Sequence, residues 1–490
     1  MRGRRSAGEG RPFACTALPG SSPSPRSYDI MRRHGIMRRH GSHHSDDERR
    51  QRTGGRFMAT LRIEGAQIIT MADGDTEVRE GWVLEAVDGG ITYVGHAQDF
   101  QPSGEPEETI DGSGHLLMPG FVNAHTHAAM TLFRGNADDM PLEPWLHEKI
   151  WPVEAKLTED DVYWGSLLGC AEMIRAGVTC FNDMYHMPRV GTRAATDSGI
   201  RMCPSGVLLG IVPHAEDMFE EAIDFAREFA GRDDICVHPM LGPHAPYTVP
   251  REMMERVIAA AEEIGVPLHV HLAETEDNVA AAMEAYGKRP IQAMEDVGLF
   301  EVDVLGAHCV HLDDRDIETI ADKGVGVAHC PGSNLKLASG IARTKDLLAA
   351  NARVGLGTDG CGSNNNLDLL EEARLAALIA KVDTGDPTAV PAEAALRMAT
   401  LGGAQACFLD YCVGSLEVGK RCDCILVDLD APHMHPRHSL VSHMAYSAQA
   451  SDVAATIVDG KVLMRDREML TVDLPETYAK VAESAARLFA

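Results

Sequence analysis

The sequence predicts an α/β protein in which a (β/α)8 TIM-like barrel is combined with a small β-sandwich domain. The first observation is a regular alternation between about residues 118 and 410, where short apolar runs are followed by stretches with helical periodicity. The second is that strand-like segments lie on both sides of this region. Eight strands that alternate with helices are typical of a closed parallel barrel.

The elements follow from the hydrophobic pattern in chain order. Strand-like segments open the body of the chain at 60–69, 81–86, 90–95 and 114–117. The expected barrel strands are 118–125, 177–184, 200–209, 235–243, 266–273, 303–310, 324–330 and 353–359. Helical periodicity appears at 158–176, 216–230, 251–264, 314–323 and 367–383. Strands return at 424–429, 453–458 and 461–464, and a final helix is expected at 475–489.

These elements divide the chain into four segments. Residues 1–57 form a basic tail, and 58–117 form the N-terminal part of the β-sandwich domain. Residues 118–410 form the barrel, and 411–490 form the C-terminal part of the sandwich with the terminal helix. We expect the two flanks to be joined in space as one small β domain.

The net charge of -28 is divided unevenly along the 490 residues. Residues 1–57 carry 13 Arg and 5 acidic residues, whereas the other 433 residues carry 32 basic and 68 acidic ones. The tail has few large apolar residues, so we expect it to be disordered, and we expect the natural start at Met58. The alternatives for the tail are a basic arm for nucleic acid or a metal-binding stretch at His40, His43 and His44. The acidic body argues against nucleic acid as a partner.

The chain shows no signal for a membrane or an oxidising compartment. It contains no run of 18 apolar residues and no secretory signal. Its 12 Cys are scattered without a CxxC pair, which favours reduced thiols and a cytoplasmic location. Association into homo-oligomers is left open by the sequence.

Histidines and carboxylates follow the expected barrel strands, where barrel active sites lie. The first strand ends at His125 and His127, which point to the same face because strand side chains alternate. The fifth strand gives His271, with Glu274 on the loop behind it. The sixth and eighth strands end at His308 and Asp359.

His125, His127, His271 and Asp359 together suit a single divalent cation. Three imidazoles and a carboxylate bind Zn²⁺ or Fe²⁺, and Zn²⁺ is our first expectation. Such a metal would lower the pKa of its bound water to about 7. Glu274 and His308 are then natural proton handlers. His269, two residues before His271, is expected to have a structural or supporting role.

This constellation resembles the amidohydrolase superfamily over nearly all of 58–470. The matching motifs are Pro119-Gly-Phe-Val-Asn-Ala-His-Thr-His127, His271-Leu-Ala-Glu274-Thr, His308 and Gly357-Thr-Asp359. No Lys ends the fourth strand, where two-metal members carry one, so the resemblance implies a mononuclear site.

Within that superfamily the chain is similar to the 5-methylthioadenosine/S-adenosylhomocysteine deaminases. The similarity rests on Thr131-Leu-Phe-Arg-Gly, Trp151-Pro-Val-Glu154, His244-Ala-Pro-Tyr, Gly332-Ser-Asn334-Leu-Lys-Leu and Ser442-His-Met-Ala-Tyr. The resemblance implies that Glu154 holds the ribose hydroxyls and that His244 contacts the substrate, together with Glu274 and Asp359. An Arg that the family usually has after the third strand is missing from Ser205-Gly-Val-Leu-Leu-Gly-Ile-Val, so the preferred 5′ substituent stays open.

The reaction implied by the resemblance is hydrolytic deamination of a 6-aminopurine nucleoside. Glu274 would protonate N1, while His308 and Asp359 would orient the water and accept its proton. Candidate substrates are 5-methylthioadenosine, S-adenosylhomocysteine, 5′-deoxyadenosine and adenosine. The alternatives are a guanine or cytosine deaminase, a triazine chlorohydrolase, or a non-catalytic binding module on the same fold.

Overall fold

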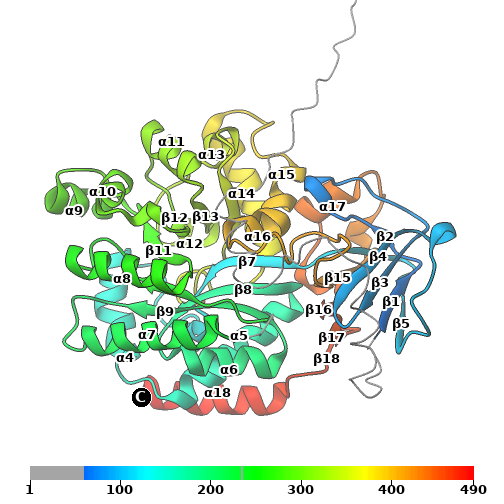
Figure 1. Ribbon diagram of the computed structural model, residues 1–490, viewed down its shortest axis with the longest axis horizontal. Coiled ribbons are helices and arrows are strands. Elements are labelled where there is room, and N and C mark those ends of the chain that lie inside the picture. The colour runs from blue at the N-terminus through cyan, green and yellow to red at the C-terminus, as the bar shows by residue number, and fades with distance from the viewer. Residues whose placement is uncertain (1–59, 233–235) are drawn as a thin grey trace, which may run out of the picture. The chain divides into compact units, whose positions relative to one another are not determined.

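A computed structural model describes residues 60–232 and 236–490 (Figure 1). Eight parallel strands close into a barrel in the order β10-β11-β12-β13-β14-β7-β8-β9. Their bounds are β7 (Phe121–Thr126), β8 (Val178–Tyr185), β9 (Arg201–Leu208), β10 (Met240–Pro243), β11 (Leu268–Leu272), β12 (Val304–His308), β13 (Gly326–His329) and β14 (Arg353–Leu356). The predicted (β/α)8 barrel is confirmed, and each of the eight expected apolar runs overlaps one of its strands.

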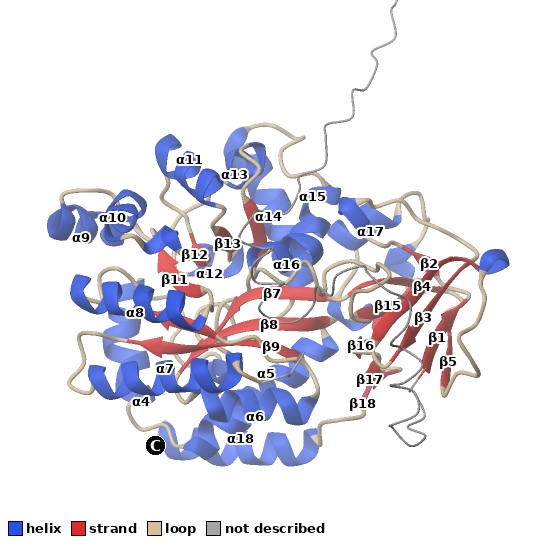
Figure 2. Ribbon diagram, in the orientation of Figure 1, coloured by secondary structure: helices blue, strands red, loops and turns tan. Residues whose placement is uncertain are grey.

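Helices surround the barrel strands (Figure 2). Those between β7 and β11 are α3 (Leu142–Pro144), α4 (Trp151–Glu154), α5 (Glu159–Arg175), α6 (Pro188–Ser198), α7 (Ala215–Ala230) and α8 (Arg251–Ile264). Those after β11 are α9 (Glu276–Tyr286), α10 (Pro290–Val297), α11 (Asp314–Lys323), α12 (Pro331–Lys336), α13 (Thr344–Ala349) and α14 (Leu369–Thr384). The chain then forms α15 (Ala392–Arg397), α16 (Gly403–Ala406), α17 (Leu440–Tyr446) and the terminal α18 (Leu474–Leu488).

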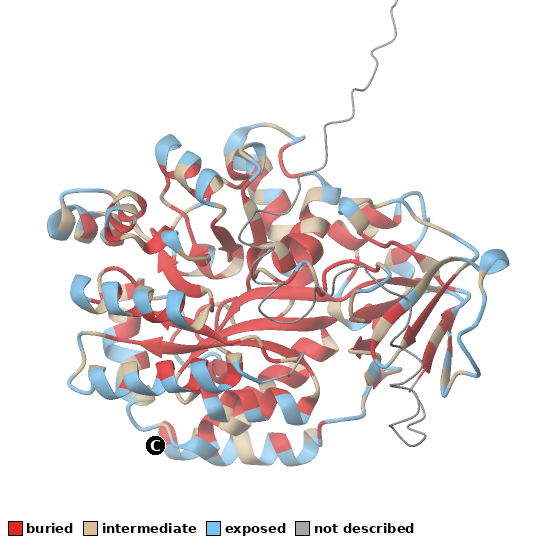
Figure 3. Cartoon of the chain, in the orientation of Figure 1, coloured by how far each residue is buried: buried red, intermediate tan, exposed pale blue. Residues whose placement is uncertain are grey.

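The apolar runs become strands because both of their faces are covered. Every residue of β7, β8 and β9 is buried, whereas the surrounding helices expose their outer faces (Figure 3). Strands that pack against helices on one side and fill a barrel on the other require this continuous apolar composition. The polar residues within these strands must therefore be satisfied inside the barrel.

Strand four and several helices differ from the sequence expectation. β10 covers only the end of the predicted run 235–243, because Pro239 has no N–H for a strand ladder and Val237 makes only an isolated bridge to Met202. α6 and α9 were not predicted. Their buried residues are mostly small or polar, so neither shows a strong stripe of large apolar side chains.

Two further sheets form the β-sandwich. The order of the four-stranded sheet is β4 (Gly90–His96), β3 (Trp82–Val87), β1 (Thr60–Glu64) and β5 (Glu108–Asp111). The order of the six-stranded sheet is β18 (Glu468–Met469), β17 (Lys461–Arg465), β16 (Val453–Val458), β15 (Cys424–Asp428), β6 (His115–Pro119) and β2 (Gln67–Ile68). One apolar cluster includes Ile63 and Leu84 from the first sheet and Leu117 and Leu426 from the second.

Strands from both ends of the chain meet in the six-stranded sheet. β6 pairs antiparallel with β15, from Pro119 opposite Cys424 to His115 opposite Asp428. This pairing explains how segments more than 300 residues apart share one core. The exact domain limits at 118 and 411 stay predictions.

The tail at 1–57, the start at Met58 and the histidines His40, His43 and His44 lie outside the described residues. Within the described part of the chain, no helix is both long and apolar enough to cross a membrane.

Candidate active site

The carboxyl ends of the barrel strands surround one cavity. Strand ends and the loops behind them supply most of its polar wall, and the segment from Leu142 to Glu154 supplies much of its apolar wall. The predicted site residues that line it are His127, Glu154, His244, His271, Glu274, His308 and Asp359. His125 lies buried beside them, so the structure brings all of the predicted site residues together.

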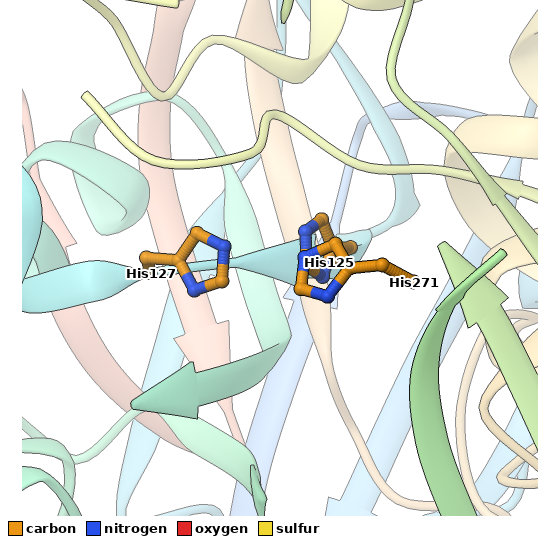
Figure 4. Close-up of side chains that lie close together, drawn as sticks. All are labelled: His125, His127 and His271. Carbon is orange, nitrogen blue, oxygen red and sulfur yellow. The ribbon is translucent and has the colours of Figure 1, made fainter. Parts of the chain in front are cut away.

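Three imidazoles form the centre of this site (Figure 4). One ring nitrogen from each of His125, His127 and His271 lies within 4.8 Å of the other two. His125 and His127 come from β7 and its end, and His271 comes from β11. A second set with the same spacing joins His125 to His308 and Asp359.

Hydrogen bonds behind the imidazoles orient their Nε2 atoms. His127 Nδ1 lies 2.5 Å from the carbonyl of Met184, and His271 Nδ1 lies 2.8 Å from the carbonyl of His244. A carbonyl only accepts, so each Nδ1 donates a proton and Nε2 is the nitrogen left to face the cluster. This is the orientation that a histidine needs to bind a metal. Burial lowers the pKa of His127, but hydrogen bonding and charge from Asp359 raise it to about 9, so a metal would displace a proton from this Nε2.

His125 is the most constrained of the three. Its Nδ1 lies 2.8 Å from Nε2 of His269, whose own Nδ1 lies 3.2 Å from the Ser205 hydroxyl. Its Nε2 is buried and makes no hydrogen bond among the described residues, and the nearest carboxylate oxygen, Asp359 Oδ1, lies 3.3 Å away. A buried polar nitrogen without a partner is costly, and a bound cation would satisfy it.

Asp359 presents one oxygen to these imidazoles and holds the other one fixed. Oδ1 lies 3.3 Å from Nε2 of both His125 and His127. Oδ2 accepts hydrogen bonds from Ser333 at 2.6 Å and Ser363 at 2.8 Å. Burial opposes ionisation, but the two imidazoles hold the pKa of Asp359 well below its usual value. The carboxylate is therefore ionised and fixed in direction.

Glu274 and His308 lie beside the cluster. His308 Nδ1 lies 2.9 Å from Oδ1 of Asn334, and its Nε2 lies 3.9 Å from Glu274 Oε2. Burial raises the pKa of Glu274, and the nearby His308 partly offsets this effect. A carboxyl group with a raised pKa is suited to proton transfer near neutral pH.

The backbone around these residues is strained. His308 and Asp359 have φ values of 67° and 59°, and Ala273 next to Glu274 has 49°. Non-glycine residues rarely adopt this left-handed region, and such residues cluster at functional sites. The strain directs the side chains at the strand ends into the cavity.

Glu154 and His244 occupy the outer part of the cavity. Glu154 ends α4, and its Oε2 lies 3.7 Å from His186 Nε2. Burial pushes the pKa of Glu154 upward, but hydrogen bonding and charge from His186 bring it below its usual value. His244 contacts Thr248 at 2.8 Å through Nδ1, and burial lowers its pKa to about 3. The site thus presents the ionised carboxylate of Glu154 and the neutral imidazole of His244.

The sequence analysis missed Tyr185 and His186, which also line the cavity. The Tyr185 hydroxyl is buried without a hydrogen-bond partner in the described structure. Both residues stand at the carboxyl end of the second barrel strand, and that position was the signal that could have identified them. Two tryptophans, Trp145 and Trp151, also line the cavity.

Comparisons with known proteins agree with this geometry. Residues 116–463 match the model of the amidohydrolase family. A 5-methylthioadenosine/S-adenosylhomocysteine deaminase from Pelotomaculum thermopropionicum is 48% identical over 431 residues, 88% of this chain and 99% of that protein. A 5′-deoxyadenosine deaminase from Methanosarcina mazei is 44% identical over 435 residues, which cover 88% of this chain and 99% of that protein. The structure of an adenosine deaminase from Xanthomonas campestris, solved with bound zinc, matches with a TM-score of 0.84 and 36% sequence identity. The match covers 88% of this chain and 99% of that one.

Proposed function

The chain belongs to the amidohydrolase family, and its relatives include 5-methylthioadenosine/S-adenosylhomocysteine deaminases. From this we propose that it hydrolytically deaminates 5′-substituted adenosines. The products are the matching inosine analogue and ammonia. The observation that carries the proposal is the shared cavity, where the imidazole cluster, Glu274 and Glu154 face one space. An enzyme that deaminates a nucleoside needs groups for both the purine and the ribose, and this cavity offers both.

We assign one divalent cation to His125, His127, His271 and Asp359. The buried His125 Nε2, which makes no hydrogen bond among the described residues, supports this assignment. So do the Nε2 atoms of His127 and His271, because the Nδ1 atoms of both rings are held by backbone carbonyls. The donor set of three nitrogens and one carboxylate oxygen suits zinc first and ferrous iron second. When bound, the metal supplies a water of lowered pKa and Lewis-acid stabilisation of the developing charge.

The proton transfers fall to the protein side chains. Glu274 donates a proton to N1 of the purine as water adds to C6. His308 and Asp359 orient that water and take up its proton. The proton held by His308 or Asp359 then passes to the exocyclic nitrogen, which leaves as ammonia, and the C6 hydroxyl returns its proton to Glu274 as the C6 carbonyl forms. The raised pKa of Glu274 keeps a fraction of this group protonated for the first transfer.

Binding of the nucleoside falls to Glu154 and His244. The ionised Glu154 accepts hydrogen bonds from the ribose hydroxyls, and these bonds are stronger than bonds to a neutral acceptor. The neutral His244 contacts the substrate from the fourth strand. A free base or a triazine has no ribose, so the placement of Glu154 favours a nucleoside over those alternatives.

A panel of ammonia-release assays tests the proposal. We expect turnover of 5-methylthioadenosine, 5′-deoxyadenosine and adenosine, and none of guanine, cytosine or an aminotriazine. Glu154→Gln should raise KM for the nucleosides because the charged acceptor is lost. Turnover of free bases without turnover of any nucleoside would overturn the assignment. Failure of the purified protein to bind zinc or iron would instead support a non-catalytic module.

A further inference from the structure

A second chamber opens beside the active-site cavity. It has a volume of about 430 Å³. The two spaces share the wall residues Trp151, Glu154, Tyr185, His186, Val207 and Leu209. The two spaces therefore adjoin each other at a wall that includes Glu154.

The walls of this second chamber are mostly apolar. β9 and the segment after it supply Val207, Leu209, Ile211 and Val212, and α7 supplies Met218. Leu157 and Met187 close the space further. Such walls favour an alkyl or thioether group, because the apolar area of the group leaves water without losing hydrogen bonds.

The charged residues of the chamber are acidic. No Lys or Arg lines it within the described structure. Glu154 lies at its inner end, and Glu221 on α7 lines it as an exposed side chain. Two nearby arginines are engaged elsewhere, since Arg189 pairs with Glu228 and Arg256 pairs with Glu216. The histidines of the wall are His186, which faces Glu154, and the exposed His214.

We propose that this chamber receives the 5′ substituent of the nucleoside and selects against a substituent that carries a carboxylate. The inference rests on the proposed function, which places the ribose at Glu154. A carboxylate in this chamber would lose water without a fixed cationic partner and would be repelled by Glu221. A neutral thioether avoids both penalties, and an ammonium group can pair with Glu221.

Three nucleosides separate the effect of the amine from the effect of the carboxylate. They are 5-methylthioadenosine, its analogue with a 3-aminopropylthio group, and S-adenosylhomocysteine, which adds a carboxylate to the carbon that carries the amine. We expect kcat/KM to be at least ~10-fold lower for S-adenosylhomocysteine than for the other two nucleosides. Values for S-adenosylhomocysteine within ~3-fold of 5-methylthioadenosine would overturn the proposal. The absence of turnover with all three nucleosides would overturn the proposed function instead.

A matched pair of variants on α7 tests the chamber itself. Glu221→Arg places a cation at the chamber wall, and we expect it to raise the kcat/KM ratio of S-adenosylhomocysteine to 5-methylthioadenosine by ~5-fold or more. Glu220→Arg makes the same charge change on an exposed neighbour outside the chamber wall, and this ratio should stay unchanged. An equal ratio change in both variants would indicate a general charge effect and would overturn the assignment of the chamber.

Discussion

At the residue scale, His125 shows how a single imidazole is fixed from behind. Its ring is fully buried, and its Nδ1 is held by His269. His269 is held in turn by Ser205, whose hydroxyl donates to Asn182 at 3.2 Å. This chain of contacts crosses the barrel interior through β8, β9 and β11. We therefore interpret His269 as a positioning residue for His125, consistent with the supporting role expected from its sequence position.

Replacement of His269 tests this interpretation. We expect His269→Asn to weaken metal binding by ~10- to 100-fold, because His125 loses the contact that fixes its ring. Competition with a chromogenic chelator measures the affinity. His329→Asn is the matched control, since His329 is also a buried barrel histidine but does not line the cavity. Equal loss of affinity in both variants would contradict the interpretation.

Glu274 is the second residue whose role can be isolated. We predict that Glu274→Gln retains the metal but lowers kcat by ~10²- to 10⁴-fold, because an amide cannot deliver the proton to N1. Metal content by elemental analysis and turnover of 5-methylthioadenosine are the two measurements. Glu276→Gln, an exposed change at the start of α9, serves as the control. Normal turnover in Glu274→Gln would exclude the proposed proton transfer.

At the element scale, α14 holds two segments of the site together through Glu372. This side chain is buried and accepts hydrogen bonds from Gly332 N–H and Asn364 Nδ2, both at 2.8 Å. Gly332 and Ser333 are neighbours at the start of α12, and Asn364 follows Ser363 in a loop. Both of these serines donate to Asp359. A helix outside the barrel thus fixes the carboxylate through α12 and through this loop.

The ionisation of Glu372 makes this support dependent on pH. Burial raises its pKa to about 8, whereas an unfolded Glu titrates near ~4.3. Between these values the folded state holds the extra proton, so the stability from this group falls as pH rises, by up to ~1.4 kcal/mol per unit. We expect the unfolding free energy of the wild type minus that of Glu372→Gln to decrease between pH 5 and 8. Urea titrations at several pH values measure this difference, and a constant difference would contradict the raised pKa.

At the scale of the whole molecule, a buried ion pair connects the barrel to the residue that precedes β15 of the six-stranded sheet. Arg201 in β9 donates to Asp423 through Nε at 2.8 Å and through a terminal nitrogen at 2.9 Å. Both side chains are almost fully buried, and Asp423 also accepts from the backbone N–H of Asp459. Asp423 directly precedes β15, so the pair fixes the point where the chain returns from the barrel to the sheet.

Removal of one charge from this pair should be costly. We expect Asp423→Asn to destabilise the protein by ~3–5 kcal/mol, because the Arg201 charge stays buried without its counter-ion. Thermal or urea unfolding measures the loss. Asp459→Asn, which weakens a partly exposed pair with Arg421, should cost only ~1 kcal/mol or less. A similar cost for both variants would show that burial of the pair is unimportant.

Much of the fold and site could be predicted from local patterns. Eight apolar runs with intervening helical periodicity identified the barrel, because strands covered on both faces need continuous apolar residues. His125, His127, His271, His308 and Asp359 could be found because the carboxyl ends of barrel strands meet at one rim. By contrast, α6 and α9 were missed because they bury mainly small or polar residues.

The barrel and the residue types at its catalytic rim follow from the amino-acid pattern alone, since alternation and strand ends are local properties. The side chains that complete the site come together through long-range packing. Ser333 reaches Asp359 across 26 residues, and Val207 and Met218 meet around the second chamber through the packing of α7. Such contacts depend on how the barrel closes and how its helices pack, and no local pattern encodes those distances.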